Sequence, residues 1–309
     1  MSQSIEVRLI ASSGYPHDVA VAARGCAWLK HHGYHVNNPD VLARRYLRFG
    51  GTDAERLADL HAIGTGPARE LTLAVRGGYG LARLLDKIDF TRIAAQARAS
   101  GTPIIGHSDF TAFQLAYLAA TGGVSFAGPM LLADFGEEHV DPFMWEHFEA
   151  ILRQPEYRIE VAAPQALPAG RSVAAEGTLW GGNLAMLCSL LGTPYMPKVD
   201  GGILFLEDIN EPPYRVERML LQLLQAGVLA TQQALVLGDF SNYRTTDYDN
   251  GYDMVAVFDY LRARLGIPVL TGLPFGHCPR KLTLPVGGTA RIEAGADGLA
   301  LLLSGYPTL

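Results

Sequence analysis

The sequence has few cysteines, no excess of positive charge and no long apolar run, and each of these absences excludes a class of protein. Its three cysteines, Cys26, Cys188 and Cys278, are scattered over 309 residues and cannot form a disulfide framework. The chain has 25 lysines and arginines against 31 aspartates and glutamates, and this formal charge of −6 disfavours nucleic-acid binding. No apolar run approaches the roughly 18–20 residues of a membrane span. We therefore expect a soluble protein with no nucleic-acid or membrane partner.

Signals for export and for metal binding are also missing. The first residues, Met1 to Glu6, lack the basic and apolar regions of a signal peptide. Because the few cysteines indicate no disulfides, a reducing cytoplasm is the simplest compartment. Neither an H-E-x-x-H nor a C-x-x-C motif is present. The sequence therefore predicts a cytoplasmic protein with no metal and no cofactor.

The N-terminal half repeats a pattern in which a short apolar run is followed by a helical segment. Such alternation predicts an α/β fold with a doubly wound, mostly parallel sheet covered by helices. Thr52 and Glu55 have the spacing of a capping box and indicate where one helix begins. The predicted strands are Val7–Ala11, Leu71–Val75 and Pro103–Gly106, and the predicted helices are Val19–Leu29, Arg56–Ile63, Leu81–Leu85 and Phe110–Ala120.

A change in composition marks the boundary between two predicted domains. Pro155, Pro164 and Pro168 fall between Arg153 and Arg171 and break any helix there. We therefore expect an N-terminal α/β domain over residues 1–152, a linker over 153–171 and a mixed α/β domain over 172–309. In the C-terminal domain, the predicted strands are Ile203–Leu206, Ala234–Leu237 and Pro268–Leu270, the helices are Tyr214–Gln225 and Tyr252–Leu265, and an antiparallel meander follows over Leu282–Val286, Thr289–Glu293 and Leu299–Leu303.

Ser108 lies directly after a predicted strand, where ligands bind in open α/β sheets. An apolar strand turns through Gly106 into a helix, so the serine hydroxyl would be exposed and the first helical amides would face the group it attacks. As an alternative, Ser108 or Asp109 merely caps the helix. Position 110 is Phe, so the segment does not match the G-x-S-x-G motif of the α/β-hydrolases.

Three glycines follow another predicted strand in the segment Arg76-Gly-Gly-Tyr-Gly80. Glycine lets the backbone approach a ligand closely, and its amides can hold a phosphate or a developing oxyanion. The segment fits neither G-x-G-x-x-G nor a Walker A loop. A tight turn between strand and helix explains the same glycines.

A carboxylate and a histidine also follow strands. Glu207 comes directly after Ile203–Leu206 and would face the crevice, whereas Asp208 would point to the opposite side if the strand period of two persists. Both carboxylates could instead stabilise the N-terminus of the next helix. His277 lies in the loop after Pro268–Leu270. Together with Ser108, these residues supply the nucleophile, the base and the orienting acid of an acyl-transfer site.

Five segments, in order and over nearly the whole chain, carry a resemblance to a known family. They are Arg76–Gly80, Gly106–Asp109, Glu176–Asn183, Leu206–Pro212 and Gly276-His277. On these segments the sequence resembles the bacterial cytoplasmic LD-carboxypeptidases, also called muramoyltetrapeptide carboxypeptidases. The microcin C immunity peptidase belongs to the same family.

This resemblance implies a serine peptidase with a Ser-His-Glu triad and without a cofactor. By position in the motifs, Ser108 is the expected nucleophile, His277 the expected base and Glu207 the expected triad acid. The amides of Gly78 and Asp109 are expected to form the oxyanion hole. The residues that bind the rest of the substrate do not follow from the motifs.

The resemblance also implies the substrate and the assembly. The expected substrate is a murein tetrapeptide that loses its terminal D-alanine by cleavage of an L,D bond, and the expected assembly is a homodimer. Two alternatives stay open from the sequence. One is an immunity peptidase of the microcin C type, and the other is a protein without catalysis that binds an anion at the glycine segment and the helix N-terminus.

Overall fold

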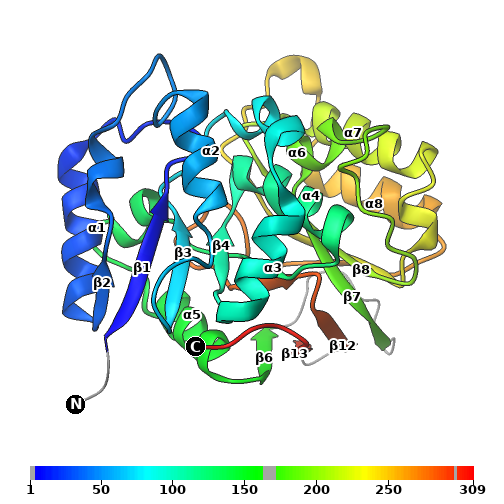
Figure 1. The fold of residues 1–309 in the computed structure, drawn as a ribbon. Coiled ribbons are helices and arrows are strands. Elements are labelled where there is room, and N and C mark those ends of the chain that lie inside the picture. Colours follow the sequence, from blue (N-terminus) through cyan, green and yellow to red (C-terminus); the bar gives the residue numbers. More distant parts are fainter. Residues whose placement is uncertain (1–3, 163–171, 296–297) are drawn as a thin grey trace.

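The computed structural model describes residues 4–162, 172–295 and 298–309 and shows two β-sheets flanked by helices (Figure 1). One sheet has six strands and the other has seven. This arrangement confirms the predicted α/β class, with a mostly parallel first sheet and antiparallel strands in the second. Among the described residues, no helix is long and apolar enough to cross a membrane.

The six-stranded sheet is parallel except at one edge. Its strand order is β11-β5-β4-β3-β1-β2, and β11 pairs antiparallel with β5. The order β2-β1-β3-β4-β5 is that of a doubly wound sheet, in which the direction of winding reverses between β1 and β3. The strands are β1 (Ile5–Ile10), β2 (Tyr34–Val36), β3 (Glu70–Ala74), β4 (Ile104–Gly106), β5 (Ser125–Ala127) and β11 (Leu284–Val286).

Local signals set the ends of the helices around this sheet. Thr52 and Glu55 form the predicted capping box at the start of α2, and Gly122 ends α4 with a left-handed φ of 64°. The helix predicted over Leu81–Leu85 is wrong, because those residues lie in short 3₁₀ turns and Asp89 caps a helix that starts later. The helices are α1 (Val19–His31), α2 (Asp53–His61), α3 (Phe90–Ser100), α4 (Thr111–Thr121) and α5 (Pro142–Arg153).

The seven-stranded sheet combines a parallel and an antiparallel half. Its order is β10-β9-β8-β7-β12-β13-β6, with parallel pairing from β10 to β7 and antiparallel pairing from β7 to β6. The strands are β6 (Glu156–Ala162), β7 (Val173–Asn183), β8 (Ile203–Ile209), β9 (Ala234–Ser241), β10 (Val269–Thr271), β12 (Thr289–Gly295) and β13 (Gly298–Ser304), and the helices are α6 (Leu184–Ser189), α7 (Pro213–Gln225) and α8 (Met254–Arg264).

Two sequence predictions about the connection of the halves need correction. Part of the expected linker is strand β6, in which buried Ile159 alternates with exposed neighbours as in a half-buried strand. The other part, 163–171, lies outside the described residues. The expected meander loses its first member, because β11 joins the first sheet, where Leu284 and Val286 are completely buried. The division into two domains at 152 and 172 stays a prediction.

Helix α4 joins the two halves and positions the site. Every residue from Thr111 to Tyr117 is buried, as expected for a helix that is apolar on all sides and covered on all sides. The Thr111 hydroxyl accepts the amide of Asn183, at the end of β7, at 3.1 Å. The N-terminus of α4 therefore lies beside the carboxyl ends of the strands of the second sheet.

Candidate active site

Ser108 occupies the sharp corner between β4 and α4 and is strained. Its φ of 64° lies in the left-handed region, which non-glycine residues enter rarely and mainly at functional sites. The short turn Ser108–Phe110 and helix α4 have no side-chain cap within the described residues, so the capping alternative for Ser108 is wrong. The half-buried hydroxyl is thus available for another role at this corner.

The glycine segment lies against this serine. A Cβ built on Gly77 would come within 2.7 Å of both Cβ and Oγ of Ser108, so only glycine fits there. The buried Asp109 carboxylate, next to Ser108, accepts the Ser13 hydroxyl at 2.6 Å and, at 3.1 Å, the amide of Leu81, which directly follows the glycine segment. Burial raises the pKa of the Asp109 carboxyl despite these hydrogen bonds. Asp109 thus fixes the glycine segment next to Ser108.

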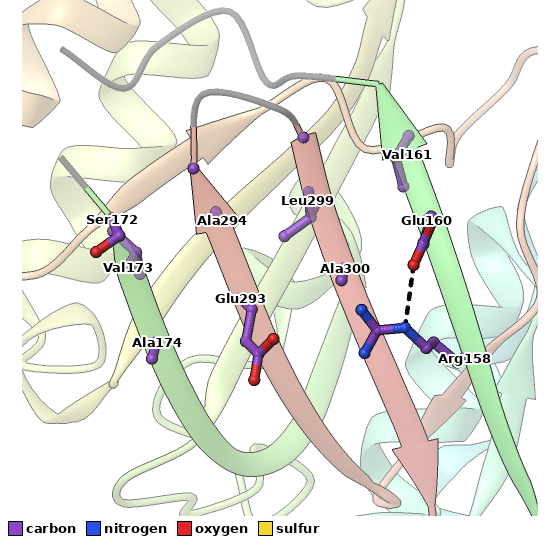
Figure 2. Close-up of a pocket in the computed structure, with 12 residues that line it drawn as sticks. Arg158, Glu160, Val161, Ser172, Val173, Ala174, Glu293, Ala294, Leu299 and Ala300 are labelled. Atoms are coloured by element: carbon purple, nitrogen blue, oxygen red, sulfur yellow. Dashed lines mark hydrogen bonds and ion pairs between the residues drawn. The ribbon is translucent and has the colours of Figure 1, made fainter. Parts of the chain in front are cut away.

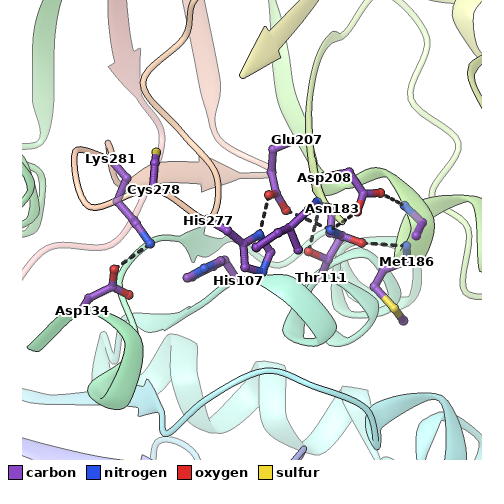
Figure 3. A network of polar contacts seen from close by, with 12 residues as sticks. His107, Thr111, Asp134, Asn183, Met186, Glu207, Asp208, His277, Cys278 and Lys281 are labelled. Carbon is purple, nitrogen blue, oxygen red and sulfur yellow. Dashed lines mark hydrogen bonds and ion pairs between the residues drawn. The ribbon is translucent and has the colours of Figure 1, made fainter. Parts of the chain in front are cut away.

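Glu207 and His277 form a hydrogen-bonded pair (Figure 3). Nδ1 of His277 lies 2.7 Å from Oε2 of the completely buried Glu207. A carboxylate accepts a proton, so Nδ1 carries the hydrogen and Nε2 of the neutral ring is left as an acceptor. Burial lowers the pKa of His277, but the hydrogen bond and charge of Glu207 outweigh it, and the resulting pKa is raised.

Asn183 orients the carboxylate from the other side. Its Nδ2 donates to Oε1 of Glu207 at 3.1 Å and to Oδ1 of Asp208 at 3.3 Å (Figure 3). Its Oδ1 accepts the Met186 amide at 3.1 Å and so caps α6. The side chain therefore fixes Glu207 from a rigid position at the junction of β7 and α6.

Asp208 differs from its predicted orientation. The pairing of β8 with β9 shifts register between Leu206 and Asp208, so the strict alternation of side chains that we expected does not persist. Asp208 instead accepts the Ala185 amide at 2.9 Å, which places its carboxylate at the start of α6. Burial and the neighbouring charge of Glu207 raise the pKa of Asp208 to about 6.

A buried ion pair anchors the loop that carries His277. Nζ of Lys281 lies 2.6 Å from Oδ1 of Asp134, and both side chains are almost completely buried (Figure 3). Lys281 belongs to the segment after His277, whereas Asp134 lies in the helical turn Leu131–Phe135 of the N-terminal half. The pair therefore ties the histidine loop to the half that carries Ser108.

Two other titratable groups near this site are held in their neutral forms. The ring of His107 lies 5.0 Å from that of His277, and burial followed by the charges of Lys281 and His277 lowers its pKa well below the usual value. Burial also raises the pKa of the Cys278 thiol to about 11, so the thiol stays protonated. Over the described ranges, no group of three or more side chains is arranged to hold a metal ion.

Ser108 and His277 line one pocket of about 280 Å³, and Glu207 lies behind the histidine. Gly77, Gly78 and Arg76 line the same pocket. The structure thus brings together the serine, the base, the acid and the glycine segment that the sequence singled out.

A second pocket, of about 520 Å³, lies on the exposed face of β6, β7, β12 and β13 (Figure 2). Its charged lining consists of Arg158, Glu160 and Glu293, and Arg158 pairs with Glu160 at 3.1 Å. Glu293 pairs with Arg291 at 3.0 Å, so each of these charges has a partner on the exposed sheet face. The smaller pocket, which has the strained serine and the histidine, is therefore the candidate active site.

Sequence reasoning missed several residues of the site. The sequence singles out Gly77 only as one of three glycines, and Asn183 only as the last residue of a segment that carries the resemblance. The available signal for Gly77 is that it follows a strand and precedes Gly78, the candidate oxyanion donor. The signal for Asn183 is that it is a polar residue at the end of β7. Nothing in the local sequence indicated that Lys281 pairs with Asp134, because the two residues are far apart along the chain.

Comparisons with known proteins agree with this geometry. Residues 7–128 match the LD-carboxypeptidase N-terminal domain and residues 176–292 match the LD-carboxypeptidase C-terminal domain. A crystal structure of muramoyltetrapeptide carboxypeptidase from Oxalobacter formigenes is similar with a TM-score of 0.88 and 44% identity, covering 98% of this chain and 100% of that one.

Two curated proteins extend the comparison. The murein tetrapeptide carboxypeptidase of Pseudomonas aeruginosa is 32% identical over 86% of this chain and 86% of its own length. The microcin C7 self-immunity protein of Escherichia coli is 27% identical over 87% of this chain and 84% of its own length. From the two domain matches and the identity to the Pseudomonas enzyme, we conclude that this chain belongs to the LD-carboxypeptidase family.

Proposed function

We propose that this protein is a serine carboxypeptidase that removes the terminal D-alanine from murein tetrapeptides. The observation that carries the proposal is the shared pocket of Ser108 and His277, with His277 held by a buried carboxylate at 2.7 Å. A strained serine, a histidine with its Nε2 as acceptor and an orienting acid are the three groups that acyl transfer requires. Metal-binding motifs are not needed for this chemistry.

In this mechanism His277 moves the protons. Its Nε2 takes the proton of the Ser108 hydroxyl while Oγ attacks the scissile carbonyl, and it then protonates the leaving amine. Water then attacks the acyl-enzyme with the same histidine as the base. Glu207 keeps the proton on Nδ1 and stabilises the imidazolium that forms in each step.

The amides of Gly78 and Asp109 are the donors proposed for the oxyanion hole. Gly78 lines the pocket and Asp109 directly follows the nucleophile, so both amides belong to segments that border Ser108. In comparable enzymes the loss of one such donor costs about 3–4 kcal/mol of transition-state stabilisation. The Asp109 side chain supports the arrangement, because it accepts the amide of Leu81, the residue directly after the glycine segment.

The substrate is inferred from the relatives. The Pseudomonas protein is named a murein tetrapeptide carboxypeptidase and the Oxalobacter structure a muramoyltetrapeptide carboxypeptidase. The identity to the Oxalobacter protein, 44%, exceeds that to the microcin C7 self-immunity protein, 27%. We therefore place this chain with the murein enzymes and keep immunity to a peptidyl-nucleotide antibiotic as the alternative.

Kinetics with both substrate classes test this choice. The purified protein is given a murein tetrapeptide and, separately, an aminoacyl sulfamoyl nucleotide. We expect kcat/KM for the tetrapeptide to exceed that for the nucleotide at least tenfold. A preference for the nucleotide would establish the alternative, and binding of both without turnover would establish an anion-binding protein instead of an enzyme.

The pH dependence of activity follows from the pair of His277 and Glu207. Ser108 can be deprotonated only by a neutral His277, and Glu207 raises the pKa of His277 above its ordinary value of 6.5. We therefore expect kcat/KM to fall on the acid side with a midpoint above pH 6.5. The contribution of this pair to the stability of the protein has the opposite pH dependence to the activity. It is complete at low pH and is lost as the pH rises through the pKa of His277 in the folded protein.

Measuring kcat/KM between about pH 5 and about pH 9 gives this midpoint directly. Glu207→Gln should move the midpoint to lower pH in the remaining activity, because the hydrogen bond and the charge that raise the pKa are weakened. An acid midpoint that stays unchanged in Glu207→Gln would contradict the assignment of His277 as the base that Glu207 orients.

Gly77→Ala should slow the reaction by crowding the nucleophile. The new methyl group would lie 2.7 Å from Cβ and Oγ of Ser108, so the serine or the glycine segment must move. Since a displacement of about 1 Å can cost roughly 100-fold in rate, we expect kcat to fall by about that factor. Gly266→Ala is the matched control, because a Cβ there has nothing within 4 Å. Equal activity of the two variants would show that Gly77 does not border the reacting atoms.

A further inference from the structure

Arg76 is an unpaired cation in the active-site pocket. It lies two residues after the end of β3 and, with Ser108 and His277, lines the pocket. Its half-buried guanidinium has no carboxylate within ion-pair distance in the part of the chain that the structure describes. A cation that is removed from water without an anionic partner is costly unless a ligand supplies the anion.

The Arg76 guanidinium is held in place through its Nη1 atom, and its Nε and Nη2 atoms have no hydrogen-bond acceptor among the described contacts. Nη1 donates to the Tyr15 carbonyl at 3.3 Å and to Nδ1 of His17 at 2.8 Å. Among the described contacts, none involves Nε or Nη2 as a hydrogen-bond donor. These two nitrogens form the planar edge that binds a carboxylate through two parallel hydrogen bonds.

Two glycines leave room beside this edge. Nε lies 3.3 Å from the position of a Cβ on Gly14, and Nη2 lies 3.8 Å from that of a Cβ on Gly78. Gly14 follows β1 and Arg76 follows β3, so the guanidinium sits between the two strands where the winding of the sheet reverses. This crevice is the expected ligand position in a doubly wound sheet.

We propose that Arg76 binds the C-terminal carboxylate of the residue that the enzyme releases. This inference rests on the proposed carboxypeptidase function. In a peptide, that carboxylate is separated from the scissile carbonyl by only the amide nitrogen and one Cα, so it must lie near the oxyanion donors. Arg76 meets this requirement because its neighbour Gly77 borders Ser108 and its Nη2 lies beside Gly78. Binding through Arg76 would make the enzyme cleave only the last peptide bond.

The test compares a tetrapeptide that ends in a free carboxylate with the same peptide ending in an amide. For the wild type we expect kcat/KM to favour the free acid by about 100-fold or more, since a site built for bidentate binding rejects an analogue that lacks the partner. Arg76→Met should lower kcat/KM for the acid by about that factor and leave the two substrates within about threefold. Arg76→Lys keeps the charge but not the planar edge and should give an intermediate preference.

Arg48→Met is the matched control, because it removes a positive charge near the pocket without changing Arg76. Arg48 is an exposed arginine whose charge acts on Arg76 and whose guanidinium lies 5.6 Å from the centre of the Tyr79 ring. Its variant should keep the wild-type preference.

The outcomes separate this inference from the proposed function. If the wild type cleaves neither peptide, the proposed function fails. If it cleaves the acid and Arg76→Met or Arg76→Lys keeps the full preference, the role of Arg76 is refuted. The same conclusion follows if Arg48→Met loses the preference for the free acid as strongly as Arg76→Met does.

Discussion

Replacing Ser108 by alanine is expected to lower kcat on a murein tetrapeptide by at least about three orders of magnitude while the protein stays folded. The alanine side chain provides no nucleophile, and the members of a triad act as one unit, so the other groups cannot compensate. His277→Ala should cause a loss of the same size, because Ser108 then has no base. The measurement is steady-state release of D-alanine, together with circular dichroism and thermal unfolding of each variant.

The controls separate chemistry from stability. Ser189→Ala changes an exposed serine whose hydroxyl bonds only to the Met186 carbonyl in the described contacts, and it should leave kcat unchanged. His277→Ala removes the donor to Oε2 of the buried Glu207, although Asn183 still donates to Oε1, and the loss costs on the order of 3 kcal/mol of stability. His277→Gln keeps a donor at this position and should be equally inactive. Wild-type turnover by a folded Ser108→Ala or His277→Gln variant would refute the triad.

Glu207→Gln is expected to lower kcat on the order of 10³-fold or more, since the neutral amide no longer holds His277 in the required tautomer or stabilises its charged form. The side chain is completely buried and bonded to both His277 and Asn183, so a glutamine of nearly the same shape can remain in place. The effect should therefore appear in kcat and in the pH midpoint, with little change in thermal unfolding.

Glu211→Gln is the matched control for this prediction. Glu211 lies four residues further on and pairs with Arg215 at 2.9 Å, so it is a second carboxylate of the same segment outside the pocket. Because such partly exposed pairs contribute only about 0–1 kcal/mol, the variant should keep its stability and its activity. A larger loss of kcat in Glu211→Gln than in Glu207→Gln would mean that the orienting acid has been misassigned.

The sequence singled out several residues of the candidate site because they follow strands. The carboxyl ends of parallel strands meet at one edge of a sheet, so Ser108 after β4 and Arg76 after β3 had to lie close together. Apolar periodicity located both strands, and the resemblance to LD-carboxypeptidases assigned roles to Glu207 and His277. The structure adds the hydrogen bond of 2.7 Å between those two side chains.

Contacts between distant segments could not be predicted in this way. Strand β11 pairs with β5 across more than half of the chain, and nothing in its short apolar run distinguishes this pairing from the meander that we expected. The same holds for Lys281 and Asp134, whose pairing depends on the folded positions of two loops. Such pairings follow from tertiary packing, which local sequence patterns do not predict.

Other expectations stay predictions. The amide donors at Gly78 and Asp109, the homodimer, the cytoplasmic location and the absence of a metal or cofactor rest on the sequence and on the resemblance. The geometry supports the first of these, since the segments of both amides border Ser108.

Mass spectrometry of a purified muropeptide mixture, before and after incubation with the protein, tests the central claim most directly. We predict that tetrapeptides lose one terminal alanine and become tripeptides, that free D-alanine appears in equal amount, and that Ser108→Ala leaves the mixture unchanged. Cleavage at an internal bond, an unchanged mixture with the folded wild type, or equal conversion by Ser108→Ala would contradict the account.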